Sequence, residues 1–571
     1  MKPLARALLV SLLLVPSGPA AAAWPNDPTV NVPIVTAPGH QLGVTAVDDG
    51  AGGAIVTWRV YGAVQSIVAQ HLLASGSVDP TWPPAGAVLF SEPGAFPPAI
   101  ASDGAGGAIA TWADPRSGGY DIYAAHVLAS GVIDPAWPTE GLAVCTAGDT
   151  QGNPVIVSDQ GGGAIITWED RRNGGDYDVF AQRVLGGGTV DPGWPANGRA
   201  LCAEPYQQSN PRITFDGTGG AIVTWRDSRS LTNFDPYVQR IDNAGVLAWG
   251  PGGVALCSNT HDQYWPDILS DGAGGAIVVW SDFRNGPGDI YAQRVNGAGT
   301  AQWTPDGAVV CAKPLSQAFD YSYIAADGEG GVIVAWEEMD DIYAQRLSDS
   351  GAQLWEPTGV VVCTAPNEQY RPHPVPDGAG GAVVIWQDLR SAGAPEDEGV
   401  LDIYAQRVGA SGTVDARWPV NGLAVCAAPS DQANPIVISD NDGGVIALWE
   451  DYRSGPSDPY AQRIDLSGVL GVPNLSVVEE VSGLSTLDVW PNPVSKTRLT
   501  IRFTLPGTSA ARLDLLDLMG RRVGSREVGS LGAGEHTLGF SDTEHLAPGL
   551  YMVQLRTARG VRTKRVVIHR P

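Results

Sequence analysis

Short apolar segments recur along the chain, and each is bounded by turn-forming glycine, aspartate or proline residues. One of these segments, with the pattern Ala-Ile-Val-x-Trp, follows a glycine-rich turn and ends in a tryptophan in eight copies. Self-similarity at a regular interval predicts a repeat architecture. The anchoring tryptophans are Trp58, Trp112, Trp168, Trp225, Trp280, Trp336, Trp386 and Trp449.

The spacing of the anchors indicates the size of each unit. Successive anchors are 54, 56, 57, 55, 56, 50 and 63 residues apart. Each unit contains four β-rich segments: Gly-x-x-Val-Cys, Pro-x-Ile-x-Ser-Asp, Ala-Ile-Val-x-Trp and Asp-Ile-Tyr-Ala-Gln-Arg-Val. Four short strands with turns between them are typical of a propeller blade. The sequence therefore predicts an all-β protein with eight four-stranded blades.

The two ends of the repeat region are complementary. The eighth unit reaches Arg463 and then lacks the Gly-x-x-Val-Cys strand, whereas residues 32–36 match that strand with no unit before them. We expect the N-terminal strand to complete the last blade, because such a clasp removes free sheet edges. The ends favour one closed ring of eight, while two half-rings or an open solenoid stay as alternatives.

The chain divides into four regions. Residues 1–23 resemble a signal peptide, with Lys2 and Arg6 before an apolar run and small residues at its end. The propeller is predicted for residues 24–470, a linker for 471–485 and a small β-sandwich for 486–571. No later run is apolar and long enough for a membrane helix. The product is expected outside the cell or on its surface.

Charge separates the propeller from the C-terminal region. Residues 24–479 hold 20 Lys and Arg against 53 Asp and Glu, whereas residues 480–571 hold 13 against 8. An acidic surface repels phosphate backbones, so nucleic acid is not an expected partner. The sequence contains no cofactor or metal-binding motif, and calcium binding is left undecided.

All six cysteines occupy one position of the repeat: Cys145, Cys202, Cys257, Cys311, Cys363 and Cys426. Val35 and Phe90 stand there in the other two units. Equivalent positions on neighbouring blades lie too far apart for a disulfide, and replacement by Val or Phe indicates a buried apolar position. We predict six free, buried thiols.

Two polar patterns also recur. A glutamine lies six residues after the cysteine position in seven units, and Trp-x-Asp-x-Arg follows the anchor in six. Rings of ligand-binding groups are one interpretation. We favour a structural one, in which Asp caps its turn and pairs with Arg, because active sites rarely repeat around a ring.

A second series of tryptophans contains Trp82, Trp137, Trp194, Trp249, Trp303, Trp355 and Trp418.

One face of the ring is predicted to carry the variable loops. The loops after the cysteines and the Asp-x-Arg loops share this face, because alternate connections of antiparallel strands lie on opposite sides. Variable loops on a rigid face commonly bind ligands. The candidate ligand-binding residues are Tyr206, Tyr264, Trp265, Phe319, Tyr321 and Tyr370. The alternative is that these loops have diverged without function and that the aromatics cover blade edges.

The sequence does not decide whether the protein is an enzyme, but it favours a protein without enzymatic activity. No HExxH, GxSxG or phosphate-loop motif is present, and no catalytic residue is assigned. A catalytic group should occur once, off the repeat pattern. The non-repeating candidates are His261, Glu337, Glu338 and His373.

The C-terminal region carries three motifs in a fixed order. They are Pro491-Asn492-Pro493, an Asp-x-x-Gly-Arg segment with Gly520 and Arg521, and Gly-x-Tyr-x-x-x-Leu with Gly549 and Tyr551. These residues resemble the type A C-terminal sorting domain of the type IX secretion system, which is related to FlgD-like immunoglobulin domains. The resemblance implies an Ig-like β-sandwich that the outer-membrane translocon recognises. An Ig-like spacer or cap is the alternative.

Together these features predict a secreted or cell-surface, non-catalytic binding propeller. Its ligand would be a polysaccharide or a surface protein. The alternative is a propeller hydrolase or lyase that acts on glycans through carboxylates on the variable face. The identity of the ligand and cleavage of the C-terminal domain are not decided by the sequence.

Overall fold

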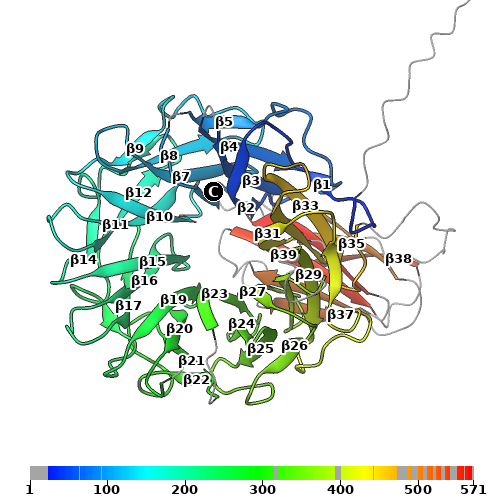
Figure 1. Cartoon of the computed structure of the whole chain (residues 1–571). Coiled ribbons are helices and arrows are strands. Elements are labelled where there is room, and N and C mark those ends of the chain that lie inside the picture. Colours follow the sequence, from blue (N-terminus) through cyan, green and yellow to red (C-terminus); the bar gives the residue numbers. More distant parts are fainter. Residues whose placement is uncertain are drawn as a thin grey trace, which may run out of the picture.

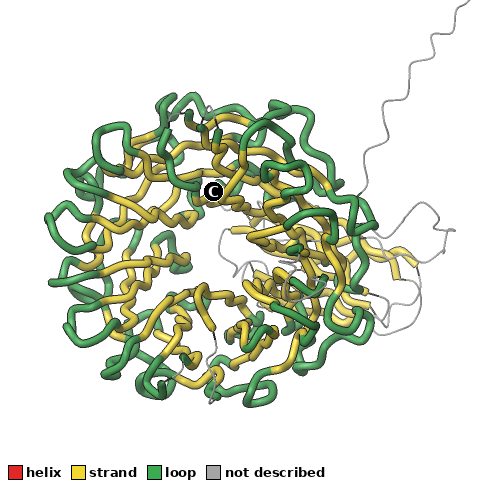
Figure 2. The backbone as a smooth tube through the Cα atoms, viewed as in Figure 1, coloured by secondary structure: helices red, strands yellow, loops and turns green. Residues whose placement is uncertain are grey.

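The protein is described by a computed structural model. It covers residues 24–471 except 63–64, 92, 287, 314–317, 392–399 and 442, and then residues 487–490, 499–505, 511–517, 522–528, 534–540, 549–557 and 560–568. All regular structure in these ranges is β (Figure 2). The predicted signal peptide and residues 491–493, 520 and 521 of the sorting motifs lie outside the described residues.

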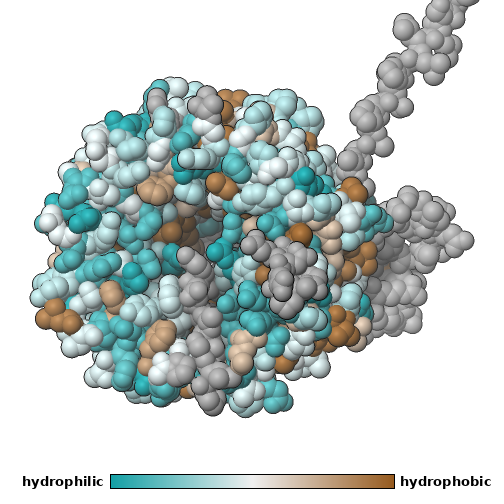
Figure 3. Space-filling view, in the orientation of Figure 1, coloured by the Kyte–Doolittle hydropathy of each residue, from teal (hydrophilic) through white to brown (hydrophobic). Residues whose placement is uncertain are grey.

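Eight antiparallel sheets are arranged in a ring (Figure 1), which confirms the eight-bladed propeller. We call the hollow at the centre of the ring, visible in the space-filling view (Figure 3), the channel. The innermost strands are β2 (His40–Asp48), β6 (Ala99–Ser102), β10 (Gln151–Ser158), β15 (Gln208–Phe215), β19 (Gln263–Ser270), β23 (Ala318–Ala326), β27 (Gln369–Pro376) and β31 (Gln432–Ser439). The second strands are β3 (Ala54–Tyr61), β7 (Ala108–Asp114), β11 (Ala164–Asp170), β16 (Ala221–Asp227), β20 (Ala276–Asp282), β24 (Val332–Glu338), β28 (Ala382–Asp388) and β32 (Gly444–Asp451).

The outer half of each blade completes the sheet. The third strands are β4 (Ser66–Leu72), β8 (Asp121–Val127), β12 (Asp178–Leu185), β17 (Asp235–Ile241), β21 (Asp289–Val295), β25 (Asp341–Leu347), β29 (Asp402–Val408) and β33 (Asp458–Asp465). The outermost strands are β5 (Ala87–Phe90), β9 (Leu142–Cys145), β14 (Arg199–Cys202), β18 (Val254–Ala255), β22 (Ala308–Cys311), β26 (Val360–Cys363), β30 (Leu423–Cys426) and β1 (Val32–Pro33). The third blade also has the short strand β13 (Thr189–Val190), which pairs with β12.

The ring is closed by residues from both ends of the propeller. β1 pairs with β33, so that Val32 faces Ala461 and Pro33 faces Tyr460. The innermost strands contact one another in sequence around the ring, and β31 contacts β2. The predicted N-terminal clasp is therefore confirmed, and the alternatives of half-rings and an open solenoid are wrong.

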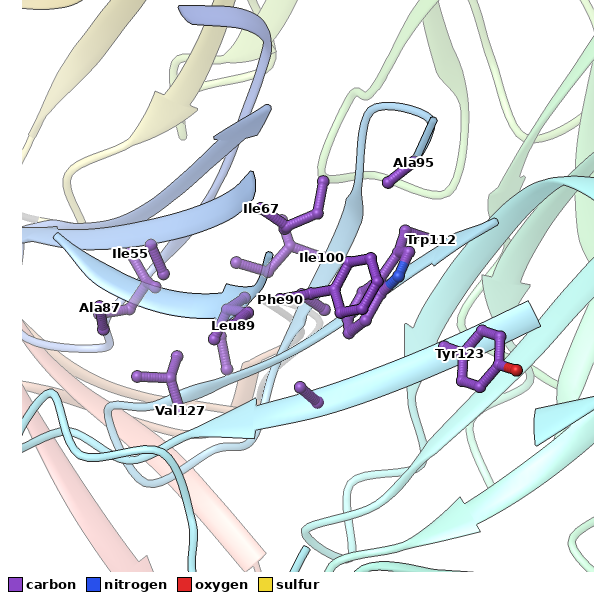
Figure 4. Packing of buried hydrophobic residues seen from close by; sticks show 14 of the residues in the cluster. Ile55, Ile67, Ala87, Leu89, Phe90, Ala95, Ile100, Trp112, Tyr123 and Val127 are labelled. Carbon is purple, nitrogen blue, oxygen red and sulfur yellow. The ribbon is translucent and has the colours of Figure 1, made fainter. Parts of the chain in front are cut away.

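Apolar side chains fill the space between neighbouring blades. Between the first two blades, Phe90 of β5 stacks on Trp112 of β7 with ring centroids 5.4 Å apart (Figure 4). Ile55 and Ile67 from the first blade join the same cluster. All eight anchoring tryptophans are at most 1% exposed. The apolar segments that identify the repeat thus form interfaces between blades, and the stability of each blade depends on its neighbours.

The second tryptophan series also joins neighbouring blades, and it has an eighth member, Trp24. In every copy the indole N–H donates to a backbone carbonyl of the next blade, as Trp82 does to Ala129 O at 3.0 Å. Trp24 donates in the same way to Ala74 O at 2.9 Å, and its ring lies against Gly76. Trp24 is 3% exposed, so the start of the described chain is part of the ring closure.

The cysteine position also links adjacent blades. All six cysteines are buried and unbridged, which confirms the prediction of free thiols. Cys145 at the end of β9 accepts a hydrogen bond from Arg172 Nη2 of the next blade at 3.2 Å. Burial raises the pKa of the Cys145 thiol to about 12, so it is protonated at physiological pH.

The Trp-x-Asp-x-Arg pattern forms a buried hydrogen-bonded group in each of the six blades that carry it. In the fourth blade, Trp225 Nε1 donates to Asp227 Oδ2 at 2.9 Å, and Arg229 donates to both carboxylate oxygens. Arg229 also reaches Gly252 O at 2.9 Å. These contacts connect the end of β16 to the loop before β18, and they leave the carboxylate with no oxygen directed at a ligand.

Histidines replace the repeat arginine in the first two blades. In the third blade, Arg183 pairs with Asp159 at 2.7 Å and Asp191 at 3.2 Å. His71 bridges the equivalent carboxylates of Asp49 and Asp79, each at 2.9 Å, and His126 does so for Asp103 and Asp134.

These substitutions predict a pH dependence. Burial opposes protonation of His71 and His126, but hydrogen bonds and charges from the paired aspartates outweigh it and raise both pKa values above 6.5. A raised histidine pKa stabilises the folded state fully below the unfolded-state value, and this contribution is lost as pH rises through the folded-state value. We expect the melting temperature to fall as pH rises from the unfolded-state pKa to the folded-state pKa of these histidines. The fall should be smaller in the double variant His71→Arg/His126→Arg. Equal pH profiles by calorimetry would contradict this role.

The C-terminal region is a β-sandwich, as predicted. One sheet contains β34 (Leu487–Trp490), β35 (Leu499–Leu505) and β38 (Gly534–Phe540) in that order. The other has the order β37 (Arg522–Glu527), β36 (Ala511–Asp517), β39 (Gly549–Thr557) and β40 (Gly560–Ile568). A core that includes Ile501, Phe503 and Leu555 lies between the sheets. Gly549 begins β39, and Tyr551 of the sorting motif is 8% exposed in this core.

Candidate functional site

At one equivalent position of the innermost strands, the type of residue differs between the two halves of the ring. This position pairs with the residue that precedes the anchoring tryptophan, and its side chain is partly exposed in all eight blades. From the eighth blade through the third, small or mainly apolar residues occupy it, namely Ile436, Thr45, Ala99 and Val155. From the fourth blade through the seventh, the residues are Arg212, Asp267, Tyr323 and His373. The channel therefore has a polar half and a less polar half.

A β-bulge brings further side chains to the same region. The register of the innermost strand shifts just before this position, and the bulged residue has a left-handed backbone in six blades. Gly43 has φ +66°, and a Cβ there would lie 2.4 Å from Pro97 Cβ, so glycine is required. Arg371 and Asn434 adopt the same conformation with φ 54° and 53°. Bulges re-aim side chains and are common beside functional sites.

Some of these residues, together with their neighbours in the chain, surround a cavity of about 570 Å³ within the channel. The centre of the ring is visibly hollowed in Figure 3. The lining residues are Leu42, Gly43, Val44, Arg212, Tyr323, Arg371, His373, Asn434, Pro435, Ile436 and Glu450. Most come from the first halves of innermost strands, so the cavity lies toward the face with the Cys-to-Pro and Asp-x-Arg loops, which we call the loop face. Its volume is typical of a site for a small ligand.

Glu450 is the carboxylate among the lining residues, and it holds the cavity wall together. Its Oε1 accepts a hydrogen bond from Gly43 N at 2.7 Å, across the closure between the eighth and first blades. Its Oε2 accepts one from Asn434 Nδ2 at 3.0 Å. Burial raises the pKa of Glu450 despite these donors. The side chain therefore has a structural task within the wall.

The polar half contains two groups with shifted pKa values. Burial, with a further contribution from the charge of Arg371, lowers the pKa of His373 to about 3, so its imidazole is neutral. The His373 ring lies against Tyr323, with centroids 3.8 Å apart. On β19, which adjoins the strand of Tyr323, burial raises the pKa of Asp267 to about 6, and the charge of Arg212 opposes this rise. Such shifts are typical of functional sites.

Of the aromatic residues predicted to bind ligand, the four with described side chains do not line this cavity. Tyr264 is packed among other rings, with centroids 5.6 Å from Phe234 and 5.3 Å from Trp265. Trp265 has the bulge conformation, with φ 51°. Tyr206 is 45% exposed in the loop before β15. Tyr370 is half-buried on β27. The structure thus places Tyr264 beside Trp265 on β19, and it leaves Tyr206 in a separate loop and Tyr370 on a separate strand.

Phe319 and Tyr321 fall within β23, and their side chains lie outside the described residues.

Of the four non-repeating candidates, His373 lines the cavity. Glu338 instead pairs with Lys313 at 2.6 Å, and His261 is exposed in a loop. Glu337 Oε2 accepts a hydrogen bond from Arg371 N at 3.4 Å. Sequence reasoning missed Arg212 and Tyr323. A comparison of the residue four positions after each repeated glutamine would have found Arg212, because Gln208 precedes it by four.

No group of three or more His, Cys, Asp or Glu side chains in the described ranges is arranged to hold a metal ion. Within those ranges there is also no helix that is long and apolar enough to span a membrane.

The C-terminal sandwich indicates the cellular location of the protein. Residues 488–569 match the family described as the secretion system C-terminal sorting domain. The chain carries a C-terminal sorting domain. This match confirms the resemblance to the type IX sorting domain, and the protein is secreted to the cell surface or the extracellular space. No curated protein sequence matches the chain.

Solved structures show weak likeness to the propeller. A Dyadobacter fermentans protein of unknown function is 12% identical, with a TM-score of 0.32, and the match covers 55% of this chain and 94% of that chain. A Penicillium chrysogenum α-L-arabinanase complexed with arabinobiose is 13% identical (TM-score 0.32, 56% and 94%). A Fusarium graminearum α-L-arabinofuranosidase is 12% identical (TM-score 0.29, 56% and 94%). Likeness at this level carries no information on the ligand of the present chain.

Proposed function

We propose that this secreted propeller binds a polysaccharide in its central cavity without cleaving it. The observation that supports the proposal is the concentration of Arg212, Tyr323 and His373 at one position that four of the other blades fill with small or mainly apolar residues. Structural groups in this ring repeat, as the tryptophans and Asp-Arg pairs do. A cluster that breaks the pattern around a cavity is better explained by ligand binding than by folding.

The shape and lining of the cavity favour a sugar chain over a protein surface. A stable protein interface needs roughly 800 Å² on each partner, usually on a broad surface. The cavity instead offers a recessed space of about 570 Å³ with an aromatic ring, an amide and guanidinium groups on its walls. These groups suit the hydroxyls and C–H faces of two or three sugar rings.

The absence of cleavage is inferred from the carboxylates. Glycoside hydrolysis ordinarily uses two carboxyl groups that flank the scissile bond. Among the described lining residues, Glu450 is the one carboxylate, and both of its oxygens accept hydrogen bonds from the wall.

A glycan-cleaving enzyme is the second candidate function. Asp267, with a pKa raised to about 6, has the protonation behaviour of a general acid. Product analysis on every glycan that binds distinguishes the two functions, because a hydrolase or lyase releases shorter chains and a binding protein does not.

Filling the cavity tests the proposed site. In Ile436→Trp, the larger side chain enters from the less polar wall, and we expect retention on immobilised polysaccharides to fall to background in a glycan screen. Folding should be preserved, because Ile436 is partly exposed to the channel. Val420→Trp is the matched control, since Val420 of the neighbouring seventh blade is 89% exposed and does not line the cavity.

Variants at the loop face test the alternative location of the ligand site. If Tyr264→Ala and Tyr370→Ala abolish retention while Ile436→Trp binds normally, the ligand site lies at the loop face around these tyrosines and the proposed cavity site is wrong.

A further inference from the structure

Two arginines line the cavity of a strongly acidic protein. The whole chain has a formal net charge of −26, yet Arg212 of the fourth blade and Arg371 of the seventh both line the cavity. We propose that the ligand is an anionic saccharide whose carboxylate or sulfate groups are bound by Arg212 and Arg371. This inference rests on the proposed function and specifies the class of its ligand.

Arg212 differs from the arginines that repeat in the blades. Arg183 and Arg294 each bind a buried aspartate at 3.1 Å or less. Arg212 Nη1 donates to the backbone oxygen of Pro211 at 3.2 Å, and no ion pair joins Arg212 to a carboxylate of the described residues. Burial raises the pKa values of Asp267 and Glu169, and both residues are near enough for the charge of Arg212 to oppose this rise, but they do not form an ion pair with it. A guanidinium has five donors, so Arg212 retains donors for a ligand.

Arg371 is held toward the cavity by its backbone and by a neighbour. It occupies the bulge of β27 with φ 54°, a conformation that is uncommon for a long side chain. Its Nη1 donates to Asn434 Oδ1 of the next blade. A planar guanidinium positioned in this way matches the geometry of a carboxylate or a sulfate.

The opposite wall suits the rest of an acidic sugar. Leu42, Val44, Pro435 and Ile436 line the cavity on the side formed by the first and eighth blades. A uronic acid or sulfated sugar presents an anionic group on one edge and C–H bonds on its ring faces. A cavity with Arg212 across the ring from these aliphatic side chains, and Arg371 beside them on the seventh blade, complements both features.

Paired ligands that differ only in charge test this inference. Isothermal titration of residues 24–571 would compare oligogalacturonate with its methyl ester, and dextran sulfate with dextran. We expect one anionic ligand to bind at least about 10-fold more tightly than its neutral counterpart, as for hydrogen bonds to a charged group. The arm that responds identifies carboxylate or sulfate as the recognised group.

Arg212→Met removes the charge and keeps most of the side-chain volume. We expect it to weaken binding of the anionic form by about 10- to 100-fold and to weaken binding of the neutral form much less. Arg417→Met is the matched control, because it removes the same charge from a side chain that is 57% exposed and outside the cavity.

The outcomes separate this inference from the proposed function. Equal affinity for charged and neutral forms, or equal effects of Arg212→Met and Arg417→Met, would overturn the anionic class. If Ile436→Trp still abolishes binding of a neutral glycan, the proposed function stands even though the ligand is not anionic. If no glycan binds in a manner that depends on Ile436, the proposed function itself fails.

Discussion

Deletion of residues 486–571 is expected to abolish passage of the protein across the outer membrane. Residues 488–569 match the C-terminal sorting family, so the truncated chain lacks the domain that the translocon is expected to recognise. In a bacterium with a type IX system, the truncated propeller should accumulate in the periplasm. Immunoblots of medium, surface-exposed protein and periplasm measure the distribution.

Two controls exclude misfolding as the cause. Replacement of residues 486–571 by an unrelated Ig-like domain keeps the size of the chain, and near-ultraviolet circular dichroism reports the packing of the propeller tryptophans. Fusion of residues 486–571 to a periplasmic reporter should send that reporter outside the cell. Export of the truncated protein at the level of the intact chain would show that the sandwich is a spacer or a cap.

Substitution of Trp24 by Ala is expected to destabilise the propeller by roughly 3–5 kcal/mol, the usual cost of removing a large buried aromatic side chain. Trp24 is 3% exposed, and its N–H bonds Ala74 O at 2.9 Å. The residue also belongs to the segment that closes the ring, where Asn31 Nδ2 donates to Val425 O at 3.1 Å. Loss of this anchor should loosen the first and eighth blades together.

Guanidinium denaturation of residues 24–571 measures this effect, and hydrogen exchange in β2 and β31 shows where the ring opens. Val30→Ala is the control, because Val30 lies in the same segment and is 55% exposed. If Trp24→Ala shifts the unfolding midpoint no further than Val30→Ala, the N-terminal segment does not hold the ring closed.

The fold could be predicted from sequence because its signals are local and repeated. A single anchor such as Trp112 is weak, but eight copies establish the length of the unit, and replacement of cysteine by Phe90 identifies a buried position. Trp24 was missed because it directly follows the predicted signal peptide and no complete unit precedes it. Its Trp-Pro pair, which also occurs at Trp82-Pro83, was the available signal.

The binding site could not be located in the same way. Alternation along a strand normally indicates which side chains share a face, but a bulge shifts this alternation by one residue. In β23 the shift between Ala318 and Tyr323 is longer still, so counting from the repeated glutamine misplaces Tyr323. Arg371 is directed by a left-handed backbone that no sequence pattern indicates. The aromatic loops were easier to recognise, although the described ones do not line the cavity.

The location of a bound ligand tests the central site most directly. A crystal structure of residues 24–571 with the glycan that binds most tightly in the screen would provide it. Electron density for the sugar is expected inside the ring, in contact with Arg212, Arg371 and Tyr323. Sugar bound on Tyr206, Tyr264 or Tyr370 with the channel empty would contradict a central binding site.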